Sequence, residues 1–466
     1  MSERDHHDPV NEYEREPVPE RALLGLKNYL GQFAGEHVAG TELMIGPLFL
    51  ASGVSAFDFI FGLLLGNLLA VLSWTFFTAP IATRARLTLY FQLEQICGRR
   101  VVLLYNLANG VMFTVLAGAM ITVSATALGV YFKFSMPQLT DTLPTGTGWV
   151  LAVLATGVLF SVVAAYGYRF VSRFANIAAP WLVAMFVAFG IIGLREMGLK
   201  SVGDFWNVAS NVVWTGGAPQ PGQVKFGFWH VMFFAWFCNM AWHIGMADLS
   251  VLRYARKSWY GLASAAGMYV GHFMAWIAAS LLYAVQLQQD PANTAVLPGP
   301  LAYRACGVAG LLAVVTAGWT TANPTLYRAG LAFQSLKPAS SRFKVTLITG
   351  LIASVTAVFP IVTMRLLDFV ALWGMILMPM GAVIFMDFWV LPRLGLRSNF
   401  AAAAGVRLNW AAGLAWLLTL AACTWLVLTG RTQIFFVSLP GWFVTSLLYV
   451  VLSKVQQGYA SRPAAA

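Results

Sequence analysis

LGQFAGEHVAGTELMIGPLFLASG, residues 30–53, is the stretch around which the chain is organised. It is long enough to cross a bilayer, which takes about 20 apolar residues. Yet it contains Glu36, His37 and Glu42, and it is interrupted by several glycines, among them Gly40. A charged side chain inside a bilayer is costly, so an ordinary membrane anchor does not carry one. The stretch therefore predicts a transmembrane helix that lines a polar path and unwinds near Gly40, because glycine tolerates irregular backbone.

The composition indicates a polytopic membrane protein whose surroundings are the lipid bilayer. The 466 residues are 59% hydrophobic and only 10% charged, and the mean hydropathy is +0.71. A soluble domain carries about 25% charged residues. The net charge of +11 does not predict nucleic acid as a partner, because the basic residues gather at the ends of apolar segments. The four cysteines lack paired spacing, which favours packing roles over disulfides or a metal site.

Apolar runs separated by polar or Gly/Pro clusters predict twelve transmembrane helices. With the N-terminus inside, 22 Lys and Arg residues face the cytoplasm and 7 face outward. Positive residues favour the cytoplasmic side, so we expect both termini to be cytoplasmic and the protein to lie in the plasma (inner) membrane. The expected helices are 30–53, 56–79, 101–130, 149–166, 175–194, 226–247, 261–286, 302–326, 343–362, 367–391, 408–429 and 434–453.

Helices 1 and 6 form an unusual pair. Helix 6 carries His230, Asn239 and His243 within its apolar run, and Asp248 follows at its end. Polar or Gly-interrupted segments that open the two halves of a chain point to inverted repeats, with a binding site at the breaks. The expected organisation is a disordered cytoplasmic tail (1–25), a first five-helix repeat (26–200), a second five-helix repeat (201–395), two additional helices (396–455) and a cytoplasmic tail (456–466).

Helix 8 is rich in hydroxyl groups. Thr320 and Thr321 precede Asn323, and such hydroxyls either ligate a hard cation or bond back to their own helix. Intramembrane acids are functional by default, so a functional role is favoured for Glu36; the alternative is a structural carboxylate bonded to backbone or to His37.

At the inner helix ends, two acidic residues are expected to form ion pairs with basic residues nearby in sequence. Asp248 is expected to pair with Arg253, and Asp387 with Arg393. His230 and His272 are expected to be packing or interface histidines.

Six stretches follow one another in order along most of the chain: GVSAFDFIFGLLLGNLL (53–69), RARLTLYFQLEQICGRR (84–100), YGYRFVSRFANIAAP (166–180), ADLSVLRYARKS (247–258), WTTANPTLYRAGLAF (319–333) and MILMPMGAVIFMDFWVLPR (375–393). Together they resemble the nucleobase–cation symporter-1 family, which includes cytosine, allantoin and hydantoin permeases. The resemblance implies an all-α polytopic membrane protein of the LeuT type, with about 12 transmembrane helices in a five-plus-five inverted repeat plus two C-terminal helices.

The resemblance also implies a function and a site. The function is secondary active transport by alternating access, in which Na+ or H+ drives the import of a small nucleobase-like or related nitrogenous compound. The implied cation-binding positions are Glu36, Gly40, Ala317, Thr320 and Thr321. The expected substrate-binding positions are Thr41, Glu42, Phe113, Leu116, Cys238, Asn239, Ala241, His243, Ala322 and Asn323.

Several alternatives remain at this point. If sodium binds, the Glu36 carboxylate offsets its charge; if it does not, Glu36 can itself carry a proton, and the paired threonines favour sodium. The alternative function is a membrane-embedded sensor or enzyme that reuses the transporter scaffold. No Walker motif, zinc spacing or Ser-His-Asp order stands out, so we expect no enzyme activity, no catalytic residues and no cofactor beyond the coupling ion.

Overall fold

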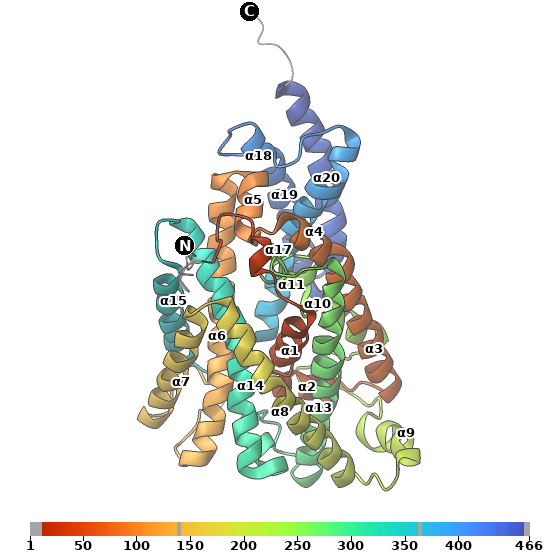
Figure 1. The fold of residues 1–466 in the computed structure, drawn as a ribbon. Coiled ribbons are helices and arrows are strands. Elements are labelled where there is room, and N and C mark those ends of the chain that lie inside the picture. Colours follow the sequence, from red (N-terminus) through yellow and green to blue (C-terminus); the bar gives the residue numbers. More distant parts are fainter. Residues whose placement is uncertain (1–11, 138–140, 362–365, 461–466) are drawn as a thin grey trace, which may run out of the picture.

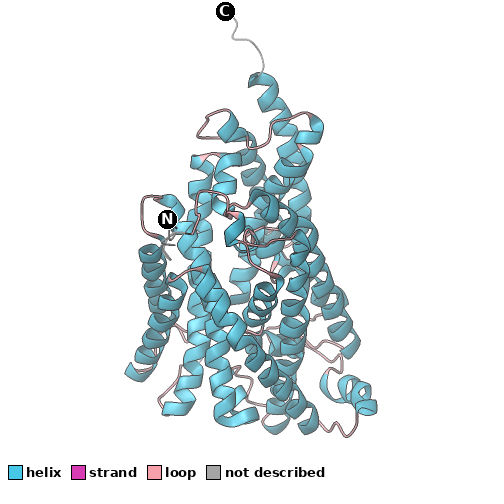
Figure 2. Cartoon of the chain, viewed as in Figure 1, coloured by secondary structure: helices cyan, strands magenta, loops and turns pink. Residues whose placement is uncertain are grey.

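The computed structural model describes residues 12–137, 141–361 and 366–460, and helices make up most of this part of the chain (Figure 2). The described residues contain no β-strand and only two isolated bridges. The long helices are α3 (Ala56–Ser73), continued by η2 (Trp74–Thr78) and α4 (Ala79–Ala85); α6 (Arg99–Phe132); α7 (Thr147–Ala165); α8 (Tyr168–Glu196); η6 (Ala266–Phe273), continued by α13 (Met274–Gln289); α14 (Pro298–Leu336); α17 (Leu366–Phe385); α19 (Trp410–Leu428); and α20 (Ile434–Ala460).

Nine described helices are long and apolar enough to cross a membrane. Together with the two interrupted helices described next and with α15 (Arg342–Ala357), they account for the twelve expected crossings. Shorter elements connect them, including α5 (Leu89–Cys97), α9 (Phe205–Val208), η5 (Ser258–Ala263) and α18 (Phe400–Ala403). The chain is thus an all-α polytopic membrane protein, as its apolar composition predicts.

Helices 1 and 6 are broken in the middle, as expected. Helix 1 consists of α1 (Leu26–His37) and α2 (Glu42–Ala51), so the unwound segment 38–41 includes Gly40. Helix 6 consists of α10 (Phe228–Phe237), α11 (Met240–His243) and α12 (Leu249–Leu252). Each break leaves carbonyl oxygens and N–H groups without partners in their own helix. Both breaks therefore bring free backbone polar groups into the middle of the bundle.

Two further irregularities flank these breaks. The π-helical segments η2 and η6 lie in helices 2 and 7, and such segments are frequent at functional sites. Helix 1 also packs closely on helix 7, because a side chain at Gly46 would lie 2.5 Å from the Trp276 carbonyl oxygen. In Figure 1, α6 and α14 run side by side through the bundle.

Residues 12–25 form an ordered strap across the bundle. The strap is drawn in red in the upper half of Figure 1, the half toward which the C-terminal end of α20 extends. Val18 N–H donates to the Arg86 carbonyl (3.0 Å), Leu24 N–H donates to the Tyr254 carbonyl (2.7 Å), and Val18 is buried. The expectation of a disordered tail is therefore wrong for residues 12–25, because apolar and charged side chains of this segment find partners on the bundle. Likewise α20 continues through residues 456–460, which were expected to be tail. The outer tail residues, 1–11 and 461–466, lie outside the described part of the chain.

Candidate functional site

Backbone and hydroxyl oxygens gather where the break in helix 1 meets helix 8, which is α14. The Thr321 hydroxyl lies 2.9 Å from the Glu36 carbonyl oxygen and 3.1 Å from the Ala317 carbonyl oxygen. The Thr320 hydroxyl lies 3.0 Å from the same Ala317 oxygen. A Cβ added to Gly40 would lie 3.4 Å from backbone atoms of α14, so the unwound segment reaches the same helix. The five residues implied as cation ligands therefore lie at one junction.

The chemistry of this junction suits a hard cation. Carbonyl and hydroxyl oxygens are the ligands that such ions take. The carbonyls at the end of α1 also carry the partial negative charge of a helix C-terminus. Since each hydroxyl has one hydrogen, its lone pairs stay available to an ion.

The Glu36 carboxylate points away from this junction, toward a buried arginine of helix 8. Arg328 Nη1 lies 2.6 Å from Glu36 Oε1, and Arg328 Nη2 lies 2.5 Å from Asp248 Oδ1. Trp74 of η2 donates its indole N–H to the other Asp248 oxygen at 2.7 Å. The three ionic side chains are at most 6% exposed. With both acids ionised, this triad of Glu36, Arg328 and Asp248 carries a net charge of −1.

The triad corrects two expectations. Asp248 does not pair with Arg253, whose guanidinium instead donates to the carbonyls of Glu12 and Tyr13 in the strap. Arg328 lies outside the expected helix 302–326, but α14 continues past it to Leu336 and places it inside the bundle. Its position inside the stretch WTTANPTLYRAGLAF was the available signal.

Asp387 also has other partners than expected. It accepts hydrogen bonds from the Tyr449 hydroxyl (2.8 Å) and the Asn399 N–H (2.9 Å), while Arg393 donates to the Trp389 carbonyl.

Glu42, after the break, faces the opposite side of helix 1. Its carboxylate accepts the indole N–H of Trp276, and its Oε1 lies 3.6 Å from His272 Nε2. Asn239, at the break of helix 6, lies 3.4 Å from the same imidazole nitrogen. His272, expected to be a packing or interface histidine, contacts residues of both broken helices. The two glutamates of helix 1 therefore belong to different polar groups, one toward helix 8 and one toward helix 7.

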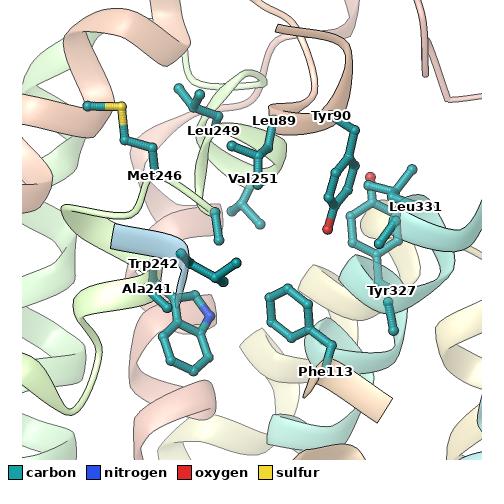
Figure 3. Close-up of a cluster of buried hydrophobic side chains, with 14 of the residues drawn as sticks. Leu89, Tyr90, Phe113, Ala241, Trp242, Met246, Leu249, Val251, Tyr327 and Leu331 are labelled. Atoms are coloured by element: carbon teal, nitrogen blue, oxygen red, sulfur yellow. The ribbon is translucent and has the colours of Figure 1, made fainter. Parts of the chain in front are cut away.

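An aromatic cluster lies among helices 3, 6 and 10. The ring of Phe113 is 4.4 Å from Trp373 and 6.1 Å from Trp242, and the two indoles are 4.6 Å apart. Figure 3 shows Phe113 of α6 beside Trp242 of α11. Leu116, Ala241 and Ala322, all expected at the substrate site, are buried in the large hydrophobic core that also contains these three rings. The sequence reasoning missed both tryptophans, although Trp242 follows directly on the polar break of helix 6.

The remaining expected residues lie apart from this cluster. His243 contacts the Trp236 carbonyl through Nε2 (3.0 Å), and Thr41 is buried in the helix 1 break. Trp319 packs on Phe174 of α8. Asn323 is one turn beyond Trp319 on α14, so Asn323 faces α8 as well. Its buried amide has no hydrogen-bond partner among the described residues.

Cys238 lines a separate cleft of about 360 Å³ between helices 6, 10 and 12. The lining residues are Phe234, Phe237, Cys238, Met240, Val370, Ala371, Gly374, Ile434 and Ser438.

The structure was compared with known proteins. No protein-family model and no curated protein matches the sequence. Among solved structures, the chain is similar to Mhp1, a nucleobase-cation-symport-1 family transporter, in a closed conformation with bromovinylhydantoin bound, with a TM-score of 0.71, 17% identity, and coverage of 97% of this chain and 96% of that one. The inward-facing conformation of Mhp1 gives a TM-score of 0.70 at 15% identity, covering 95% and 93%.

A Na+-coupled sialic acid symporter in a substrate-bound outward-open state is also similar, with a TM-score of 0.64, 16% identity, and coverage of 96% and 92%. Both matches extend over nearly the whole length of each chain. The chain therefore shares the fold of Mhp1 and of the sialic acid symporter, which is the LeuT-type fold that the sequence resemblance implied.

Proposed function

We propose that this protein is a cation-coupled secondary active transporter that imports a small nucleobase-like or related nitrogenous compound by alternating access. The observation that carries the proposal is the oxygen junction of Glu36, Ala317, Thr320 and Thr321 at the break of helix 1. Sodium is the coupling ion that best fits carbonyl and hydroxyl oxygens. The strap face is the cytoplasmic side of a plasma (inner) membrane, in keeping with the Lys/Arg distribution.

The charge of the Glu36–Arg328–Asp248 triad favours a cation over an anion at the oxygen junction. With both acids ionised, the two carboxylates and one guanidinium leave one negative charge in the buried interior, where a nearby cation is attracted more strongly than in water. Glu36 contributes its carbonyl to the junction, while its carboxylate is already paired with Arg328. A role for the Glu36 carboxylate as a free proton carrier is therefore not favoured.

The aromatic cluster supports a flat, mostly apolar substrate. Phe113, Trp242 and Trp373 pack edge to face as one buried aromatic group, and the indole N–H of Trp242 is buried without a partner among the described residues. Pockets with apolar walls and few polar groups suit small neutral ligands, and an unpaired donor suits a carbonyl or ring nitrogen. Mhp1, with bromovinylhydantoin bound, gives one probe compound.

The test is uptake into proteoliposomes of labelled nucleobases, hydantoins and small amines, driven by an inward sodium gradient and compared with choline. We expect sodium to stimulate uptake of at least one compound and Thr321→Ala to abolish the stimulation. The matched control is Thr325→Ala, one turn along α14, because the Thr325 hydroxyl bonds only to its own helix at the Thr321 carbonyl (2.7 Å).

Equal uptake in sodium and choline, or sodium stimulation that survives Thr321→Ala, would refute the sodium site. Saturable binding without any uptake would instead support the sensor alternative.

A further inference from the structure

Glu42 is a buried acid that has no Lys or Arg partner among the described residues. Its side chain is 3% exposed. One carboxylate oxygen, Oε2, accepts the indole N–H of Trp276, whereas no described residue donates a hydrogen bond to Oε1. The only basic side chain at ion-pair distance in this part of the chain is His272, and its Nε2 lies 3.6 Å from Oε1, too far for a hydrogen bond. Glu36, in contrast, binds the guanidinium of Arg328.

A second oxygen acceptor lies against the same imidazole. The amide nitrogen of Asn239, at the break in helix 6, is 3.4 Å from His272 Nε2, and no described residue donates to the amide oxygen. His272 belongs to the π-helical segment η6 of helix 7, and such segments are frequent at functional sites. Helices 1 and 6 thus bring two oxygen acceptors to one histidine of helix 7, and a buried acceptor that stays unpaired is costly.

Close packing holds these groups in place. A Cβ added to Gly271 would lie 2.6 Å from His37 Cβ, so helix 7 reaches the end of α1 only because residue 271 has no side chain. The ring of His272 stacks on Trp276, with centroids 4.4 Å apart and planes 19° apart, and Trp276 donates to Glu42. The carboxylate and the imidazole are therefore preorganised, which lowers the entropic cost of binding a ligand.

We propose that Glu42, together with Asn239 and His272, recognises an amidinium or guanidinium group of the transported compound. This inference rests on the proposed transport function, and it assigns the chemical class of the substrate's polar edge. Both groups are planar cations with neighbouring N–H donors, and they bind carboxylates through charge-assisted hydrogen bonds. Such a ligand supplies the positive charge and the donors that the site lacks.

Other ligand classes match these atoms less well. Hard metal ions take several oxygen ligands, whereas this site offers one carboxylate and one amide beside an imidazole. The described part of the chain contains no group of three or more His, Cys, Asp or Glu residues that could hold a metal ion. An ammonium group brings the charge, but it lacks the parallel N–H groups that fit a carboxylate edge. A neutral amide or imide brings N–H donors without the charge.

The cleft between helices 6, 10 and 12 gives such a compound room at the same break in helix 6. Cys238 and Met240 line this cleft of about 360 Å³, and they flank Asn239 in sequence. Pockets for small ligands begin at about 300 Å³ and are mostly apolar. Phe234 and Phe237 supply apolar walls here, so the cleft suits the body of a small aromatic amidine.

The experiment compares two probes that share a shape and differ in charge. Benzamidine carries a planar amidinium group, and benzamide carries a neutral amide on the same ring. The affinity of each probe for the purified full chain, in detergent with sodium present, is measured by isothermal titration calorimetry. The ratio of the two affinities is the readout, so the result does not depend on turnover.

We expect wild type to bind benzamidine about 10- to 100-fold more tightly than benzamide, since hydrogen bonds between charged groups are the stronger ones. In Glu42→Gln, which keeps the shape and removes the charge, the ratio should fall to about one. The control is Asp387→Asn, a buried acid with partners elsewhere, which should keep the wild-type ratio. If Glu42→Gln does not fold, Glu42→Asp provides the test: it withdraws the charge by one methylene and should weaken binding of benzamidine but not of benzamide.

Equal affinities in wild type, or a preference for benzamidine that survives Glu42→Gln, would overturn the inference, while sodium-driven uptake of other compounds would leave the transport function standing. Unchanged benzamidine affinity in Glu42→Asp would overturn it as well. Loss of the preference in Thr321→Ala but not in Glu42→Gln would place the cation at the oxygen junction instead. A preference that depends on Glu42, in protein that transports none of the compounds, would refute the transport function and leave the recognition site in place.

Discussion

Replacing Gly46 by alanine should drive helices 1 and 7 apart. A Cβ at Gly46 would lie 2.5 Å from the Trp276 carbonyl oxygen, 2.6 Å from Ala279 Cβ and 2.9 Å from the Ser280 nitrogen. Ordinary contacts begin at 3.4 Å, so the backbones must separate by about 0.9 Å. Two of the three atoms belong to the backbone of α13, and no rotamer change can relieve the overlap.

The expected cost follows from these distances. Overpacking of a filled interior costs about 1–3 kcal/mol, and a backbone clash belongs in the upper half of that range. Alanine recovers about 0.5–1 kcal/mol of helix propensity over glycine. The net loss of folding free energy for Gly46→Ala should therefore be about 1–2.5 kcal/mol. Because Trp276 also donates to Glu42, the same displacement should disturb the polar group around His272.

Gly190 provides the matched control. It belongs to α8 and also faces α13, but its added Cβ would lie 3.7 Å from Ala278 Cβ, an ordinary contact. Gly190→Ala should leave stability unchanged or raise it by up to about 1 kcal/mol. The assay is the thermal unfolding midpoint of both variants in one detergent. A midpoint for Gly46→Ala that equals that of Gly190→Ala would refute the packing argument.

Three further predictions concern the strap face. Trp74→Phe removes a hydrogen bond to buried Asp248 and should cost about 1.5–3 kcal/mol in thermal or denaturant unfolding, whereas an unchanged midpoint would contradict the observed contact. Arg15→Ala breaks a largely exposed pair with Glu94 and should cost less than about 1 kcal/mol, with the strap still resistant to limited proteolysis. Burial raises the pKa of Glu12 above 4.5, although two nearby guanidinium groups lower it. Strap docking should therefore be strongest at low pH and weaken as the pH rises through this raised pKa. Limited proteolysis of the strap should show this pH dependence in wild type and lose it in Glu12→Gln.

The features that sequence could predict were those that depend on local chemistry. Intramembrane charges beside Gly40 predicted the break in helix 1, because glycine tolerates irregular backbone wherever the helix lies. That Thr320 and Thr321 meet this break was implied by the family resemblance, since their hydroxyls alone could equally bond back to their own helix.

Long-range pairing could not be predicted in the same way. Arg328 lies 292 residues from Glu36 along the chain. Nothing in the sequence around Arg328 favours Glu36 as its partner over acidic residues that are nearer in sequence. Residues 12–25 were expected to be disordered because they carry as many charged residues as a solvated tail does. Their partners are spread over several helix ends, which the local sequence does not reveal. Trp373 was missed because one tryptophan in an apolar helix usually packs or anchors.

The triad also has a consequence for biosynthesis. Glu36 and Asp248 enter the membrane well before Arg328, which follows Asp248 by 80 residues and Glu36 by 292. An arginine at the centre of an isolated helix costs about 2.5–3.5 kcal/mol to insert, and each acid carries a similar burden until its partner arrives. Helices 1 and 6 are therefore expected to remain loosely assembled at the translocon until helix 8 arrives and gives both acids a shared partner in Arg328. A nascent chain that stops short of residue 328 should be recognised as unfinished.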